Sequence, residues 1–377
     1  MYKNVFAINL SDVGGGGMSI RPAHTIALLA VTIVTLASTA PALLLAQAQS
    51  GEQWVLPRTP EGHPDIQGDW TNATITPIQR PSGLGPVLTA EQVAAIEGRR
   101  LEFIEEGYAD SDPDREAPPV GGIFLGDVLF DAASGGTGGY NYFWIDAGDH
   151  VAVFNGEQRS SLVTSPENGR IPALTPAAQR RIGEAFVRSR QLGEFDNPES
   201  RPLGERCLMS FGFNGGPPML PNYFYNNNYT IVQTPDHVMI MTEMVHDVRI
   251  IRLGQTKQPL PEHMRPWMGD SWGHWEGDVL VVETTNIHPL QPYSSPDMKV
   301  TERFSRMRED AILYEFTVDD PSTYSESWGG QIPMTAMPDQ LYEYACQEGN
   351  YALSAVLSGA RYQERMEAEE ANNSRRD

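Results

Sequence analysis

The chain contains very little cysteine. Only Cys207 and Cys346 occur among its 377 residues, and neither lies in a CxxC motif or a Cys/His set, which argues against structural zinc. In an oxidising compartment, two cysteines most simply form one disulfide. This bridge would close a loop of about 140 residues and add several kcal/mol of stability through loop-closure entropy. A pair of buried free thiols is the alternative.

Positive charge is also scarce. The chain has 27 Lys and Arg residues against 49 Asp and Glu residues, which gives a net charge of −22. Such a charge repels nucleic acid and anionic lipid head groups, and the sequence has no basic cluster that would follow a phosphate backbone. We therefore expect no nucleic-acid partner.

Long apolar runs are absent except near the start of the chain. Residues 25–45 form an uncharged apolar run that follows Arg21 and ends at Ala46-Gln47-Ala48, a small-x-small site of the kind that signal peptidase accepts. The run approaches the roughly 20 residues of a membrane-spanning helix, so a membrane anchor is the alternative. We predict a signal peptide over residues 1–48, with its true start at Met18. The mature chain is then periplasmic or secreted, without stable membrane insertion after cleavage.

The mature chain has the pattern of a mainly β fold. Between residues 226 and 362, apolar runs of strand length alternate with short turn signals, which indicates an antiparallel meander forming a lipocalin-like barrel or a sandwich. Gly68-Asp69-Trp70 favours the barrel, because a Gly-x-Trp triplet opens the first strand of many lipocalin-like barrels. The predicted strands are Tyr229–Gln233, Val238–Leu253, Trp272–Trp275, Val279–Thr285, Val300–Met307, Ile312–Val318 and Leu341–Cys346.

Residues 49–225 are expected to supply an N-terminal arm, helices and short strands that pack on this sheet, joined by long Pro/Gly-rich loops. One helix is predicted from Thr89, which opens a capping box with Gln92. A second is predicted from Pro176, a favourable first helical residue, to Gly193. The short strands are predicted at Tyr140–Ile145, Val151–Phe154 and Arg159–Thr164.

The C-terminal part is predicted to hold one more helix, over residues 350–367. Residues 363–377, which overlap the end of this helix, form a charged tail whose composition predicts disorder.

Several ionisable residues lie within the predicted strand Val238–Leu253. Alternation places His246 on one face and Glu243, Asp247 and Arg249 on the other, and both faces also carry apolar residues. A charge buried there must be paired or its pKa shifts. The simplest interpretation is a structural pair of a carboxylate with Arg249 that braces a barrel wall.

The functional hypothesis for this strand makes His246 a general acid or base. Asp247 or Glu243 would be its partner, and Arg249 would stabilise negative charge. Because an unbulged strand sends His246 and Asp247 to opposite faces, a dyad of these two residues requires a bulge.

A second group of candidate ligand-binding residues lies in the next predicted hairpin: Asp270, Trp272, His274 and Glu283. If Glu276-Gly277 is a two-residue loop, the four share one face. They either line a pocket or form an exposed face on which the indole covers its neighbours. A metal site that combines His246, His274 and a carboxylate is a weaker alternative, since no HxH or HExxH spacing supports it.

Two further motifs have alternative interpretations. Gly269–Gly273 matches G-x-S-x-G, but a hairpin rather than a helix follows, so we predict no nucleophile elbow. The polar and aromatic segment Tyr342–Tyr351 would present Tyr344, Glu348 and Tyr351 to a cavity if the disulfide anchors it. It would otherwise be a strand end that leads into a helix capped by Asn350.

Six motifs together resemble a family of secreted bacterial proteins of uncharacterised function. The resemblance covers nearly the whole mature chain and implies an exported location and a shared fold, but no activity. Gln347 departs from the family pattern, in which His is expected. The motifs are Thr59–Asn72, Arg159–Val163 with Asn168–Pro172, Glu205–Cys207, Glu243–Arg249, Gly269–Ser271 with Trp275–Asn286, and Tyr342–Tyr351.

These observations predict an exported enzyme that acts on an apolar or aromatic small molecule by acid–base chemistry, as an isomerase, lyase or hydrolase, without a cofactor. Two alternatives remain open. One is a lipocalin-like carrier of a hydrophobic ligand, and the other is an interaction protein of the cell envelope. The sequence does not determine the oligomeric state.

Overall fold

A computed structural model describes residues 54–108, 114, 145–191, 193–210, 214–222, 225–254, 256–291 and 294–375. The predicted signal peptide lies outside these residues, as does the strand predicted at Tyr140–Ile145 except for its last residue. Among the described residues, no helix combines the length and the apolar character needed to cross a bilayer.

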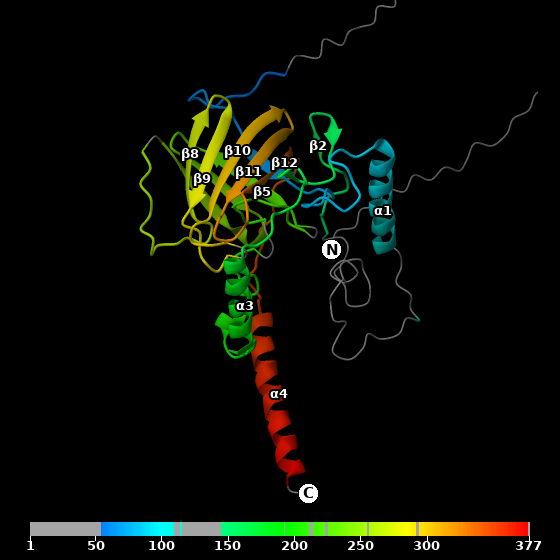
Figure 1. Cartoon of the computed structure of the whole chain (residues 1–377), viewed down its shortest axis with the longest axis vertical. Coiled ribbons are helices and arrows are strands. Elements are labelled where there is room, and N and C mark those ends of the chain that lie inside the picture. Colours follow the sequence, from blue (N-terminus) through cyan, green and yellow to red (C-terminus); the bar gives the residue numbers. More distant parts are fainter. Residues whose placement is uncertain are drawn as a thin grey trace, which may run out of the picture. The chain divides into compact units, whose positions relative to one another are not determined.

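Ten strands form one sheet that closes into a barrel (Figure 1). The order around the sheet is β1-β5-β6-β7-β8-β9-β10-β11-β12, and β1 also pairs with β12, so that only β4 lies outside the closed ring. The strands are β1 (Gly68–Thr71), β4 (Val163–Ser165), β5 (Asn228–Gln233), β6 (His237–Thr242), β7 (Val248–Leu253), β8 (Asp270–Glu276), β9 (Val279–Thr285), β10 (Lys299–Arg308), β11 (Ala311–Asp319) and β12 (Trp328–Ala336). The mainly β, lipocalin-like fold is thus confirmed.

The remaining elements lie outside the barrel. They are a hairpin of β2 (Val153–Phe154) and β3 (Glu157–Gln158), the helices α1 (Ala90–Tyr108), α3 (Pro176–Gln191) and α4 (Ala352–Ser374), and the 3-10 turns η2 (Pro198–Ser200) and η3 (Met244–His246). The capping box at α1 is present, since Thr89 and Gln92 each accept a backbone N–H from the other. Helix α4 continues to Ser374, through most of the segment for which we expected disorder.

The antiparallel meander has one exception. Strands β7 and β8 pair in parallel, with Ile251 opposite Ser271, because the connection between them returns along the barrel before β8 begins. This crossover segment contains Pro259, Pro261 and Pro266, which cannot donate to a sheet ladder.

The last strand of the barrel is not where the sequence suggested. Leu341–Cys346 forms no strand, and β12 closes the sheet instead. Gly329 and Gly330 interrupt the alternating pattern by which a strand is predicted, so the sequence did not indicate β12. The structure requires glycine at both positions because other parts of the backbone lie very close. A Cβ on Gly329 would lie 2.3 Å from the carbonyl oxygen of Phe316, and one on Gly330 would lie 2.4 Å from that of Leu162. Both contacts are too close for any side chain.

The predicted strand Val238–Leu253 is in fact two strands. Strands β6 and β7 form a hairpin with Met241 opposite Val248, and the residues between them make the turn that contains η3. Val245 and His246 both have positive φ, 60° and 46°, a backbone conformation that alternation cannot reveal. The expected division of residues 243–249 between two faces of one strand is therefore wrong.

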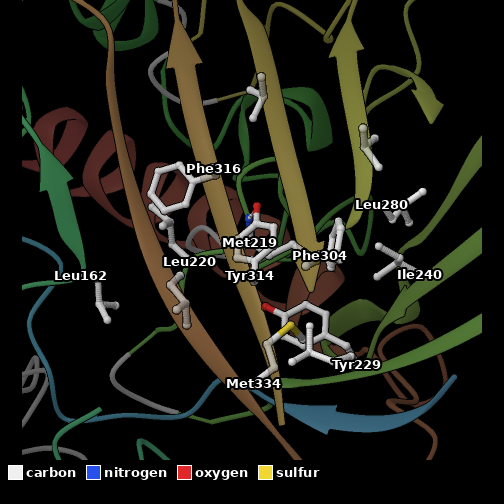
Figure 2. Packing of buried hydrophobic residues seen from close by; sticks show 14 of the residues in the cluster. Leu162, Met219, Leu220, Tyr229, Ile240, Leu280, Phe304, Tyr314, Phe316 and Met334 are labelled. Atoms are coloured by element: carbon white, nitrogen blue, oxygen red, sulfur yellow. Dashed lines mark hydrogen bonds between the residues drawn. The ribbon is translucent and has the colours of Figure 1, made fainter. Parts of the chain in front are cut away.

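The barrel interior is filled by its own side chains and by the segment 214–220, which we call the plug. Met219 and Leu220 of the plug lie among the interior residues of the strands (Figure 2). The hydroxyl of Tyr314 accepts the backbone N–H of Met219, and the hydroxyl of Tyr229 donates to the carbonyl of Asn214. Burial raises the pKa of both tyrosine hydroxyls, so both stay protonated.

The Gly-x-Trp motif opens β1 as predicted. Trp70 is only 2% exposed, its indole N–H donates to the carbonyl of Ile66, and the guanidinium of Arg306 lies 4.8 Å above its ring. The indole thus covers the barrel end opposite the one at which β10 and β12 begin.

Candidate functional site

A cavity of about 1230 Å³ opens at one end of the barrel. We call this end the mouth; it is where β9 and β11 end and where β10 and β12 begin. Most of the cavity floor is apolar and comes from the barrel strands, the segments beside them and the plug: Leu220, Met298, Val318, Tyr324 and Trp328. The walls are loop segments, at residues 77–79, 171–174, 199–204, 206, 209–210, 215–218 and 290–291.

Asp247 lies directly behind the wall of this cavity. One of its carboxylate oxygens, Oδ2, accepts the backbone N–H of Ser210 at 2.8 Å, and Ser210 lines the cavity. The next wall residue, Gly215, is so close that a Cβ there would lie 2.6 Å from Ser210 Oγ and 3.3 Å from Asp247 Oδ2. A side chain at position 215 would therefore push against both groups.

Desolvation raises the pKa of Asp247 from 3.8 to about 6. The hydrogen bonds from Ser210 and the nearby imidazole of His246 act in the opposite direction but are outweighed. The carboxyl group therefore changes charge near neutral pH, which is a property that acid–base chemistry requires.

The other two polar residues of the η3 turn do not reach the cavity. His246 is exposed, and its Nδ1 donates to the carbonyl of Tyr344 at 3.0 Å. Glu243 is half-buried and accepts the side-chain amide of Asn228 at 2.8 Å. The turn therefore brings His246 and Asp247 to the mouth, but it does not place them as a hydrogen-bonded dyad.

Arg249 lies apart from the mouth, inside the barrel. Its guanidinium makes two hydrogen bonds to the carboxylate of Glu302 on β10, at 2.6 and 2.8 Å, and both side chains are at most 3% exposed. The hydroxyl of Tyr314 donates to the same carboxylate at 2.9 Å. The structural interpretation of Arg249 thus agrees with the geometry, although its partner is neither Glu243 nor Asp247. A role in stabilising charge on a ligand in the mouth cavity does not fit this position.

The hairpin of β8 and β9 presents its predicted residues on the outside of the barrel. The turn is Gly277-Asp278, so Trp272 lies opposite Glu283 rather than Val281, and the faces stay as expected. Arg252 stacks 4.1 Å above Trp272 and forms an ion pair with Asp270. Glu283 pairs with Lys257, and His274 contacts Glu276. These residues form an outer face with its own ion pairs, on which His274 is exposed, Trp272 and Glu283 are partly buried and Asp270 is buried, and none of the four lines the mouth cavity.

Ser271 of the G-x-S-x-G match points the other way, into the barrel. Its hydroxyl is hydrogen-bonded to that of Thr284 at 2.8 Å and is buried. This agrees with the absence of a nucleophile elbow that the hairpin pattern predicted.

The disulfide between Cys207 and Cys346 is present, with a Cα–Cα distance of 5.8 Å. It joins the cavity wall to the segment before α4, and Tyr344 packs in the small apolar cluster around it. Glu348 and Tyr351 are exposed, the latter by 79%, and neither lines the cavity. Asn350 donates instead to the carbonyl of Glu205 and faces the sulfur of Cys207, which agrees with a structural role for this segment.

Sequence reasoning missed the charged residues that do line the cavity: Glu199, Arg201 and Arg206. They lie in an irregular segment without periodicity, and their only sequence signal is that Arg206 precedes Cys207. Arg201 is buried and forms ion pairs with Glu194 and Glu205, both at 2.8 Å. Within the part of the chain that the structure describes, no three His, Cys, Asp or Glu residues are grouped as metal ligands.

The site thus combines a large cavity, an apolar floor, a few charged groups on the walls and a carboxyl group of raised pKa behind them. This arrangement suits a molecule that is mostly apolar and carries a small polar part. Comparison of the chain with protein-family models, curated proteins and solved structures gave no match, so a proposal for its function depends on this geometry.

Proposed function

We propose that this protein binds a small, mainly apolar molecule in the mouth cavity. The observation that carries the proposal is the hollow of about 1230 Å³ above a barrel whose own interior is packed. Ligand sites are typically concave, mostly apolar and roughly 300–1,000 Å³ in volume. The cavity is large enough for such a ligand.

The composition of the cavity supports the same proposal. Its floor residues, such as Met298, Val318 and Trp328, belong to strands or strand ends and continue into the packed core. Covering apolar surface of this kind removes it from water and yields roughly 25 cal/mol per Å². The walls come from separate loops, which is typical of binding sites carried by a rigid scaffold.

A carrier of the usual lipocalin type would hold its ligand deep inside the barrel. Here the plug occupies that space, with Met219 and Leu220 at most 3% exposed. We therefore propose that the ligand binds at the mouth, between the strand ends and the loops.

The test is a titration with N-phenyl-1-naphthylamine, an uncharged apolar probe whose fluorescence rises in an apolar site. We expect saturable binding to one site. Leu203→Trp fills part of the cavity from a loop and should weaken binding at least tenfold. The matched control is Leu101→Trp, because Leu101 is 56% exposed on α1 and lies outside the cavity. Equal binding by the two variants would contradict the proposed site.

An acid–base enzyme is the second candidate, and Asp247 is the observation that favours it. Its pKa of about 6 and its contact with the wall residue Ser210 suit a group that exchanges a proton with a bound ligand. On a substrate once identified, Asp247→Asn should abolish turnover while ligand affinity changes less than threefold. Full turnover by Asp247→Asn would contradict a catalytic role for Asp247 and would not bear on the proposed binding function.

We also propose that the protein works in the periplasm or outside the cell. The support is the Cys207–Cys346 disulfide, a type of bond that persists in oxidising compartments, together with the apolar leader predicted from the sequence. Fractionation of cells that produce the full chain should recover it outside the cytoplasm, beginning near Gln49. A cytoplasmic protein that retains the leader would contradict this.

A further inference from the structure

We infer that the ligand of the mouth cavity carries an anionic group, of the carboxylate class, and that Arg206 binds it. The inference rests on the proposed binding function and specifies the ligand. Arg206 lines the cavity and is partly buried. Its side chain makes no hydrogen bond or ion pair with any residue that the structure describes.

An unpartnered guanidinium in this position is unusual for the chain. Arg201 and Arg249, which are more deeply buried, are each held by carboxylates. Acidic residues outnumber basic ones by 49 to 27, so partners for one more arginine are plentiful. A partly buried cation that lacks a partner loses solvation without gaining a hydrogen bond. An anionic ligand supplies what is missing.

The neighbouring charges do not satisfy Arg206. Glu205, its neighbour in sequence, directs both carboxylate oxygens to Arg201, at 2.8 and 2.9 Å. Glu194 is paired with the same arginine. Glu199 also lines the cavity, but it is exposed and forms no ion pair within the described ranges, so water solvates its charge.

The backbone around Arg206 is held in place before a ligand arrives. Its N–H donates to the carbonyl of Pro202, and the next residue is the disulfide-bonded Cys207. Such a fixed base lowers the ordering cost of binding. The planar guanidinium matches a carboxylate with two parallel N–H donors, whereas a lysine acts as a point charge.

The rest of the cavity indicates the shape of the ligand. Tyr324 and Trp328 form an edge-to-face pair on the floor, with ring centroids 5.8 Å apart. Met209 and Met298 add flexible apolar surface. We therefore assign the ligand to the amphiphilic carboxylates, with an aromatic or aliphatic body on the floor and the carboxylate at Arg206.

The experiment compares 1-pyrenebutyrate with its uncharged primary amide, which has nearly the same shape. Affinities are measured by calorimetry and pyrene fluorescence for the wild-type protein and for Arg206→Gln, Arg206→Lys and Arg99→Gln. The last variant removes an exposed charge on α1, outside the cavity. Circular dichroism confirms that each variant is folded.

We expect the carboxylate to bind the wild-type protein at least tenfold more tightly than the amide. Arg206→Gln should abolish this preference by weakening only carboxylate binding. Arg206→Lys should retain part of it, and Arg99→Gln all of it. Equal affinities in the wild-type protein, or a preference that survives Arg206→Gln, would overturn the role of Arg206 and leave the binding function standing. If neither probe binds, and N-phenyl-1-naphthylamine does not bind either, the binding function itself fails.

Discussion

The interior and the mouth of the barrel differ in whether an arginine side chain has a carboxylate partner. In the interior, Arg249 is paired with Glu302, and Tyr314 donates to the same carboxylate. At the mouth, Arg206 has no such partner in the described structure and faces a cavity. The difference shows that the interior pairs its buried guanidinium with a carboxylate, whereas the mouth leaves the guanidinium of Arg206 available to a ligand.

The largest effect should come from breaking the interior pair. Glu302→Leu leaves Arg249 charged, buried and without its carboxylate, and should lower the free energy of unfolding by about 3–5 kcal/mol. Urea denaturation followed by circular dichroism measures this change. The double variant Arg249→Met/Glu302→Leu should recover most of the lost stability, because no buried charge is left unpaired. If Glu302→Leu were as stable as the wild-type protein, Arg249 and Glu302 would not form a buried ion pair on which stability depends.

The next largest effect concerns the mouth. Replacing Cys207 and Cys346 by Ala removes a link across 139 residues of sequence and should lower the free energy of unfolding by about 2–4 kcal/mol. Because Arg206 adjoins Cys207, carboxylate binding should weaken as well. Glu302→Leu serves as the comparison, since it should destabilise the protein but leave the affinity of the folded fraction unchanged. Unchanged affinity in the cysteine variant would separate the disulfide from the site.

A smaller effect, of opposite sign, is expected at Asp247. Its carboxyl group has a pKa of about 6 in the folded protein against an ordinary value of 3.8, so the folded state binds the proton more tightly than the unfolded state. Ionisation above pH 6 therefore costs stability, and Asp247→Asn removes that cost while its amide oxygen still accepts the N–H of Ser210.

We expect Asp247→Asn to stabilise the protein at pH 8 by about 1–2 kcal/mol, less than the full pKa shift implies because the group keeps some contact with water. The difference in the free energy of unfolding between this variant and the wild-type protein should shrink as the pH falls through 6. It should vanish below about pH 4, where Asp247 is uncharged in both the folded and the unfolded protein. Denaturation curves at several pH values measure it. A difference independent of pH would mean that the carboxyl group titrates normally.

The smallest effect should come from an ion pair on the outside of the barrel. Arg303 and Glu276 are 3.0 Å apart, but both are well exposed, at 39% and 49%. Arg303→Ala should change the free energy of unfolding by little more than the experimental error, because water screens exposed pairs. A loss of stability comparable to that of Glu302→Leu would show that buried and exposed ion pairs of this protein contribute equally.

The sequence contained most of the information about the barrel and little about its mouth. Alternation predicted β5, β9, β10 and β11 because each has one face in the core. It failed for β12, where close backbone contacts select Gly329 and Gly330. It also failed at Val245 and His246, where positive φ values turn the chain between two strands that look continuous.

The candidate site was harder to predict because it is assembled from loops distant in sequence. Asp247 was singled out for its place among apolar residues, and it does lie next to the cavity. Arg249 gave the same signal but lies in the barrel interior. Only the three-dimensional path of β7 shows that Asp247 and Arg249 lie in different places. Arg206 lies in a segment without periodicity. The proposal that it binds a ligand depends on its having no hydrogen-bond or ion-pair partner among the described residues, which only a structure can show.

Methyl NMR spectroscopy of methionine-labelled protein during titration with 1-pyrenebutyrate shows most directly where the ligand binds. Met209 and Met298 lie at the mouth cavity, whereas Met334 is fully buried in the interior. We predict saturable shifts of the methyl signals of Met209 and Met298, and an unchanged signal for Met334. Shifts confined to Met334, or no shifts at any of the three, would contradict the claim that the mouth is where this protein binds its ligand.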